Sequence, residues 1–311
     1  MSDEAFDIIG DVHGQAGKLL GLLKILGYRQ MDGVWSHPEQ RAIFVGDLID
    51  RGPRQLETID IVRPMVEAGR AHCVLGNHEF NAIAWATPHP EEPGEYLRSR
   101  KKASNRAQHE AFLTEVEDTP LHDELIAWFK SLPLWLDLGA IRVVHACWND
   151  GYMSRRKPHL GQNNTLTEEL VVLASRKGHW VYEAVEALRK GLEVELPDGV
   201  FFHDKDGHER RAARVKWWAP DFSSLRNSAL APRSVLAGMP DIPLPADPRL
   251  APYEGPPVFF GHYWRSGSPE VMAEKFACVD YSAGKDGPLV AYRWEGEIEL
   301  RDAHFVSSDS N

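Results

Sequence analysis

The first 80 residues repeat one pattern three times, and this repeat constrains the fold more than any other feature of the chain. A short apolar run ends in a glycine-bearing polar loop at residues 10–14, 46–53 and 76–79, and apolar residues at helical spacing follow the first two loops. Strand, loop, helix and strand in this order form the βαβ units of a parallel sheet. Because the loops of such a sheet gather at the carboxyl ends of its strands, we expect the three loops to meet at one edge.

The following segments continue the sheet material. The helix after the second loop is expected to break near Pro64 or Gly69. A Gly-Ala pair at 139–140 lies between two apolar runs and predicts a β-hairpin that ends at His145. The polar tail after Arg301 is expected to be frayed. Further strand-like runs lie at residues 258–260, 276–280, 288–293 and 297–301.

Residues 150–256 differ in character from the rest. A strand pair is predicted around the Pro-Asp-Gly turn at 197–199, a second turn is predicted at 204–207, and a proline-rich segment follows. Two helical stretches precede them, at about 165–176 and 179–190. Because sheet-like runs resume afterwards, we interpret 150–256 as a cap or insertion within a single domain that spans residues 1–311.

Charge and composition exclude several functional classes. Lys and Arg total 35 against 46 Asp and Glu, a net charge of −11, which disfavours bulk nucleic-acid binding because that requires a basic surface. We predict no membrane partner, because no apolar run is long enough to span a bilayer. The acidic start MSDEAFDIIGDVHG lacks the features of a signal peptide, so a cytoplasmic location is expected. Three cysteines without CxxC spacing indicate neither a disulfide framework nor a zinc knot. Nothing in the sequence predicts the oligomeric state.

Each strand-terminal loop carries residues that bind metal ions. Carboxylate, imidazole and amide side chains together suit Mn, Fe, Zn or Co better than a thiolate site would. An aspartate with ligands on either side can bridge two ions roughly 3.5–4 Å apart. The candidate ligands are Asp11, His13, Asp47, Asn77, His145 and His262.

Each motif taken alone has a structural alternative. GDVHG fits a strand-to-helix turn, GDLIDRGP fits a turn with a surface ion pair, and GNHE fits a helix N-terminus. A histidine directly after a strand is often a hydrogen-bonded core residue. The order of the three motifs, each one after a predicted strand, favours the metal site over these alternatives.

The motifs GDVHG at 10–14, GDLIDRG at 46–52 and GNHE at 76–79, with isolated histidines in HAC and GHY, resemble the calcineurin-like metallophosphoesterases. More narrowly, they resemble the branch of Ser/Thr protein phosphatases and symmetrical diadenosine tetraphosphatases. The resemblance covers residues 6–80, 134–148 and 257–301, a little under half of the chain. It implies an α/β sandwich of two mixed β-sheets flanked by helices, with a dinuclear metal site at the strand ends.

The resemblance also implies a ligand set. Asp11, His13 and Asp47 would hold one divalent ion. The second ion would be held by Asp47, Asn77, His145 and His262. Asp47 would therefore bridge the two ions. Manganese is the first choice of metal, with Fe, Zn, Co or Ni as alternatives.

Three further residues receive catalytic roles through the same resemblance. Arg51 would bind the substrate phosphate through its planar guanidinium, with Asn77 also in contact. His78 would act as the general acid for the leaving oxygen, oriented by Asp50. The implied reaction is direct in-line attack by metal-bound hydroxide, without a phosphoenzyme.

A basic stretch in the insertion offers a second phosphate contact, for which Arg214 is our candidate. Strand alternation places Arg210, Ala212, Arg214 and Lys216 on one face, with Arg211 opposite. Trp264 stands where many metallophosphoesterases carry another histidine, which fits the protein-phosphatase branch better. The aromatic residues Trp217, Trp218, Tyr263 and Trp264 either stack a base or pack the insertion against the core.

Three functions are consistent with these residues. The first is hydrolysis of phosphomonoesters, including phosphoserine and phosphothreonine in proteins, which requires an open groove. The alternative is a symmetrical dinucleoside polyphosphate hydrolase of the diadenosine tetraphosphate type, which requires an enclosed pocket with aromatic and cationic walls. Residues 210–218 favour this alternative slightly. The third is a binding scaffold without catalysis, and the complete set of ligands and catalytic residues argues against it.

Overall fold

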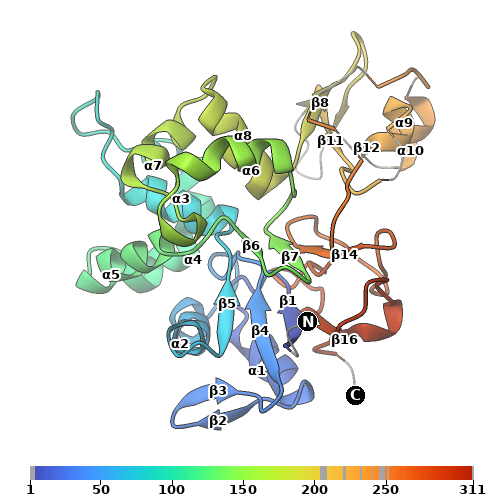
Figure 1. The fold of residues 1–311 in the computed structure, drawn as a ribbon. Helices are drawn as coiled ribbons and strands as arrows, with labels where there is room; N and C mark the ends of the chain where they lie inside the picture. Colours follow the sequence, from blue (N-terminus) through green and yellow to red (C-terminus); the bar gives the residue numbers. More distant parts are fainter. Residues whose placement is uncertain are drawn as a thin grey trace.

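The computed structural model describes residues 4–203, 209–219, 222–231, 233–239, 241–244, 249–250 and 252–309 (Figure 1). The turn expected at 204–207 lies outside the described residues. Two β-sheets pack against each other at the centre of the molecule.

The first sheet has five strands in the order β16-β15-β1-β4-β5. Strand β1 (Ala5–Ile9) runs parallel to β4 (Gln40–Phe44), which runs parallel to β5 (Ala71–Cys73). On the other side, β1 pairs antiparallel with β15 (Val290–Trp294), which pairs with β16 (Phe305–Ser307). The three parallel strands are those predicted from the repeated pattern.

The second sheet has four strands in the order β14-β13-β7-β6. Strands β14 (Phe276–Cys278), β13 (Val258–Phe260) and β7 (Arg142–Val144) are parallel. Strand β6 (Trp135–Asp137) pairs antiparallel with β7 as the predicted hairpin. The two mixed sheets confirm the predicted α/β sandwich.

Alternation along the strands builds the core between the sheets. Phe6 and Ile8 of β1 face a buried apolar cluster that also contains Val143 of β7 and Phe259 of β13. Ile9, one position further along, belongs to the larger cluster on the helix-covered side. Since successive side chains of a strand point to opposite faces, β1 contributes side chains to both buried clusters.

Helices cover the outer face of the first sheet and the end where the loops meet. They are α1 (Ala16–Ile25), α2 (Gln55–Glu67), α3 (Asn77–Ala86), α4 (Ala103–Val116) and α5 (Pro120–Lys130). Of the two expected break points, Pro64 is wrong because α2 runs through this residue, whereas Gly69 is confirmed because α2 ends at Glu67, just before it. A proline in the last turn removes only one amide donor, which the helix tolerates there. A small hairpin of β2 (Arg29–Met31) and β3 (Val34–Ser36) lies between α1 and β4.

The segment 150–256 forms helices and a small sheet beside the core (Figure 1). Helices α7 (Glu168–Ser175) and α8 (Trp180–Lys190) match the two predicted helical stretches. The predicted pairing of strands across 197–199 is wrong, because β8 (Glu193–Glu195) pairs with β11 (Ala212–Val215) and β9 (Phe202–His203) pairs with β10 (Glu209–Arg210). Its helices are α6 (Asp150–Arg156), η1 (Lys157–His159), η2 (Gln162–Asn164), α7 (Glu168–Ser175), α8 (Trp180–Lys190), α9 (Leu225–Ser228) and α10 (Arg233–Gly238). Its strands are β8 (Glu193–Glu195), β9 (Phe202–His203), β10 (Glu209–Arg210), β11 (Ala212–Val215) and β12 (Ala229–Leu230).

The end of the chain differs from the expectation. Residues 297–301 form no strand, whereas a short η3 helix (Asp302–His304) leads into β16. Val306 of β16 pairs with Ala291, so the segment expected to fray closes the edge of the first sheet. Across the described part of the chain, no helix is long and apolar enough to cross a membrane.

Candidate active site

The loops after β1 and β4 are held together by their backbones. The amides of Val12 and His13 donate to the carbonyl of Asp47, at 3.1 and 2.9 Å, and Gly14 donates to Leu48 at 2.7 Å. His13 and Asp47 both adopt positive φ, of 49° and 51°. Backbone angles of this kind are uncommon outside glycine and are frequent at functional sites. These bonds bring the first two predicted loops to one edge of the sheet.

The Asp47 carboxylate lies at the centre of the candidate site. Its Oδ2 is 3.4 Å from His145 Nε2, 3.8 Å from His13 Nε2 and 3.9 Å from His78 Nε2. Its Oδ1 accepts the backbone N–H of His78 at 2.9 Å. Burial alone would raise the pKa of Asp47, but the adjacent imidazoles, His145 first, hold it well below its usual range. Asp47 is therefore an ionised, buried carboxylate surrounded by imidazole nitrogens from separate elements.

The histidine rings are oriented by hydrogen bonds from their Nδ1 atoms. His13 Nδ1 donates to the carbonyl of Ile49 at 2.9 Å, and His145 Nδ1 donates to that of Val45 at 2.7 Å. Because a carbonyl can only accept, Nδ1 of both rings carries a proton and Nε2 points inward, the orientation that metal-binding histidines use. Within the described residues, the buried Nε2 atoms of His13 and His262 have no hydrogen-bond partner. Burial also lowers the pKa of His13 to about 3, which keeps the ring in its neutral, metal-binding form.

These donors form two groups that share Asp47. One combines Asp47 with His13 and His78, and the other combines it with His145 and His262, each within 4.8 Å. Asn77 Oδ1 lies 3.1 Å from His145 Nε2, beside the second group. The donor types and the unpartnered nitrogens fit divalent metal ions.

Asp11 lies next to these groups but belongs to neither of them. Its carboxylate accepts the backbone N–H of His262, at 3.1 Å for the nearer oxygen. Burial, and then the carboxylates of Asp280 and Asp47, raise the pKa of Asp11 well above its usual range. A cation would relieve this concentration of negative charge, so Asp11 also fits the predicted ligand set.

The predicted acid and its carboxylate partner are in contact. His78 Nδ1 lies 2.5 Å from Asp50 Oδ2, and the other oxygen of Asp50 lies 2.7 Å from His109 Nδ1. Burial would raise the pKa of Asp50, but hydrogen bonds from His109 and His78 lower it to about 2. The sequence analysis missed His109, which comes from α4. Nothing in the local sequence around it signals this role.

Glu79 is a second residue that the sequence analysis missed. Its buried carboxylate accepts the backbone amides of Asp47 at 2.9 Å, Leu48 at 2.8 Å and Gly76 at 3.1 Å. It thereby joins the second loop to the third. One sequence feature could have identified it. Glu79 stands three residues after Gly76, and a glutamate at this position can accept the backbone N–H at the start of a helix.

Trp264 links Arg51 to the candidate metal ligands. Its ring stacks on that of His13, with centroids 5.5 Å apart, and the Arg51 guanidinium carbon lies 4.3 Å from its centroid. Its backbone N–H donates to buried Asp280 at 2.7 Å. The tryptophan found in place of a histidine thus supports the predicted phosphate-binding arginine.

A cavity of about 920 Å³ opens from this site toward the insertion. Asp47, Asn77, His78 and His262 line it on the core side, and β11 contributes Arg214. The predicted alternation holds for Arg210, Ala212 and Arg214, which all line the cavity, whereas Lys216 donates to the carbonyl of Asn227. Its cationic lining consists of Arg51, Arg98, Lys190, Arg210, Arg214 and Arg249.

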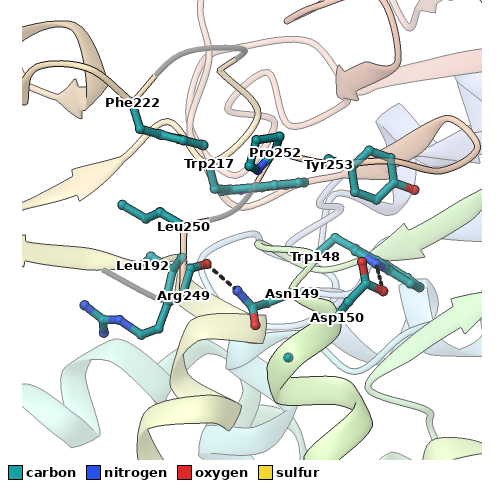
Figure 2. Close-up of a pocket in the computed structure, with 11 residues that line it drawn as sticks. Trp148, Asn149, Asp150, Leu192, Trp217, Phe222, Arg249, Leu250, Pro252 and Tyr253 are labelled. Atoms are coloured by element: carbon teal, nitrogen blue, oxygen red, sulfur yellow. Dashed lines mark hydrogen bonds between the residues drawn. The ribbon is translucent and has the colours of Figure 1, made fainter. Parts of the chain in front are cut away.

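A smaller pocket of about 90 Å³ adjoins this cavity, and Leu192 and Arg249 line both. Figure 2 shows Trp217 on one wall, with Trp148 and Asn149 on the facing wall. Trp217 Nε1 donates to Ala146 and to the Tyr263 hydroxyl, at 2.9 and 3.1 Å.

The aromatic residues of the insertion also pack against the second sheet. The rings of Trp217 and Trp218 lie with their centroids 4.9 and 5.2 Å from that of Phe260 in β13. These contacts fix the insertion against the core, the second of the two roles expected for these aromatic residues.

Comparisons with known proteins agree with this arrangement. The family profile described as calcineurin-like phosphoesterase matches residues 5–194. The asymmetrical bis(5'-nucleosyl)-tetraphosphatase PrpE of Geobacillus sp. (strain WCH70) is 29% identical over 175 residues, which cover 55% of this chain and 66% of that protein. The PrpE of Anoxybacillus flavithermus (strain DSM 21510 / WK1) is 47% identical over 176 residues, which cover 56% and 66% of the two chains. The matched part of this chain spans between 30% and 66% of the length of the first three relatives.

Solved structures show the same fold. A protein serine/threonine phosphatase from Saccharomyces cerevisiae superposes with a TM-score of 0.51 at 17% sequence identity. The match covers 98% of this chain and 79% of that protein. At this level of identity the likeness concerns the fold alone.

Proposed function

The chain belongs to the calcineurin-like phosphoesterase family, and on that premise we propose that it hydrolyses dinucleoside tetraphosphates. The cavity beside Asp47 carries the proposal, because one continuous space of about 920 Å³ joins His78 and Arg51 to the cations of the insertion. A tetraphosphate chain carries several negative charges in a row, and arginines are well suited to bind them. The relatives named as tetraphosphatases support the same substrate class.

The two substrate classes expected from the sequence make different demands on the cavity. A phosphoprotein needs an open groove, whereas here Arg210 and Arg214 face the candidate metal ligand His262 across a shared cavity. The adjoining aromatic pocket between Trp148 and Trp217 offers apolar walls near the cationic side chains that would bind the phosphates. These features favour the nucleotide over the protein substrate. The names of the relatives favour an asymmetrical cut over the symmetrical one that we expected.

We further propose that the residues around Asp47 hold two divalent ions, with manganese as the first choice. His13, Asp47 and Asp11 would hold one ion. Asp47, Asn77, His145 and His262 would hold the other. When bound, such ions activate a water molecule and neutralise phosphate charge.

The protein's own groups supply the remaining chemistry. Arg51, held over Trp264, would bind the phosphoryl group under attack. His78 Nδ1 donates to Asp50, which leaves Nε2 directed to the cavity to protonate the departing oxygen. Arg214 would contact a neighbouring phosphate. Hydrolysis adds water across one phosphorus–oxygen bond, and the proton on His78 goes to the leaving phosphate.

The test is a comparison of substrates for the manganese-loaded full chain. We expect kcat/KM for diadenosine tetraphosphate to exceed that for a phosphoserine peptide by at least roughly tenfold, a difference in transition-state free energy of about 1.4 kcal/mol. A phosphopeptide cleaved faster than the dinucleotide would reject the proposal.

A further inference from the structure

Arg98 lies in the loop between α3 and α4 and lines the large cavity together with His78 and Arg51. Its backbone N–H donates to the carbonyl of Ala84 at 3.0 Å, which fixes the loop against the end of α3. The arginine is therefore anchored in the wall of the cavity that His78 and Arg51 also line.

Two neutral side chains hold the guanidinium in place. Arg98 Nη1 donates to Asn81 Oδ1 at 3.1 Å, and Nη2 donates to Gln108 Oε1 at 2.8 Å. Its Nε is buried and has no hydrogen-bond partner within the described residues. Amide oxygens orient a cation without cancelling its charge, so Arg98 is preorganised and keeps its full positive charge.

Three of the other cations around the cavity offer a contrast. Lys190 lies 2.7 Å from Glu186, and Arg210 and Arg214 lie 3.2 and 4.0 Å from Glu193. No ion pair found in the described ranges includes Arg98; Asp50 and Glu186 act on it only from a greater distance. Burial lowers the pKa of Arg98, yet an arginine remains charged at neutral pH. A partly buried cation with no carboxylate partner gains most from an arriving anion.

Its position relative to the catalytic residues is set by two helices. Asn81 follows His78 by three residues and Asn77 by four on α3, so all three share one face within about one turn, or roughly 5 Å. Gln108 directly precedes His109, which holds Asp50. The same two helices therefore orient the proposed acid and Arg98, and both side chains line the same cavity.

We propose that Arg98, with Asn81 and Gln108, forms a second phosphate subsite, distinct from Arg51, that binds a phosphoryl group of a polyphosphate chain next to the one being cleaved. This inference rests on the proposed function and makes it more specific. It adds to the contact proposed for Arg214 a second contact that a chain of phosphates makes and a single phosphate ester does not.

Calorimetry with two non-hydrolysable probes tests the subsite without relying on turnover. The probes are methylphosphonate, with one phosphoryl group, and the triphosphate analogue in which methylene groups replace both bridging oxygens. With the manganese-loaded chain, we expect Arg98→Gln to reduce the preference for the triphosphate analogue by roughly tenfold, the effect of losing one or two charged hydrogen bonds. Arg98→Lys, which keeps the charge but loses the fork, should fall between wild type and Arg98→Gln.

Arg106 on α4 is the matched control, because it pairs with Glu110 and Glu117 on the exposed side of the helix. Arg106→Gln removes the same charge from the same region and should leave the preference unchanged. The subsite would be overturned if Arg98→Gln lost affinity equally for both probes, or if its preference for the triphosphate analogue equalled that of Arg106→Gln. If Arg98→Gln does not melt cooperatively, Arg98→Lys decides the question in the same way. A wild-type chain that fails to cleave diadenosine tetraphosphate but shows the Arg98-dependent preference would reject the proposed substrate and keep the subsite.

Discussion

His109 and Asp50 are 59 residues apart in the sequence, and their side chains meet at 2.7 Å in the interior. The second oxygen of the same carboxylate lies 2.5 Å from His78. Asp50 therefore has both oxygens engaged by imidazole N–H groups, and its orientation toward His78 depends on a residue of α4. Because His109 touches Asp50 and not the cavity, we assign it a positioning role.

Substitution of His109 should impair proton donation to the leaving group. We expect His109→Leu to lower kcat about tenfold or more for phenyl phosphate and much less for p-nitrophenyl phosphate, whose leaving group needs little protonation. His109→Asn, whose amide can replace the Nδ1–H donor, should restore most of the difference. Steady-state kcat for the two esters measures this, and equal losses on both would contradict the positioning role.

Substitution of Glu79 should weaken the metal site without removing any ligand. Glu79→Gln replaces a buried acceptor of four backbone amides by a group that carries its own donors. We expect manganese affinity to fall about 10- to 100-fold, as happens when groups that support metal ligands are lost. Titration calorimetry with the metal-free protein measures this. Unchanged affinity in a variant that melts like wild type would show that Glu79 does not organise the ligand loops.

Substitution of Trp264 should affect substrate binding through Arg51. The guanidinium lies over the indole ring at 4.3 Å, and such a contact contributes about 0.5–1 kcal/mol at an exposed site. Trp264→Leu should therefore raise KM several-fold and change kcat less, whereas Trp264→Phe should retain most of the binding. A fall in kcat with unchanged KM would place the effect on the stacked His13 ring instead.

The sequence predicted the features that are local. Asp11, His13 and Asp47 follow two parallel strands of the first sheet, so their meeting follows from the βαβ pattern alone. His145 and His262 come from the second sheet, and it was the resemblance that assigned them to the same centre. The motifs thus predicted both the sandwich and the residues that gather around Asp47.

The features that the sequence did not predict depend on packing between distant elements. Arg98 and His109 receive their surroundings from contacts between α4 and other segments, Arg98 through Gln108 and His109 through Asp50, and no periodic pattern records those contacts. Strand β8 pairs with β11, which lies well beyond the next strand in the sequence. The local turn at 197–199 therefore indicated the wrong strand pair. Edge strand β16 has only three residues and lies within a mostly polar stretch, which made it resemble a frayed tail.

The most direct test of the central claim is product analysis of diadenosine tetraphosphate after chelation and after addition of manganese, with wild type and Asp47→Asn in parallel. Asp47 faces imidazoles of both candidate ligand groups, so its loss should abolish turnover while the fold persists. We predict that manganese restores release of nucleotides of unequal phosphate number by wild type and not by Asp47→Asn. Equal nucleotide release by both proteins, or none by the manganese-loaded wild type, would contradict the account.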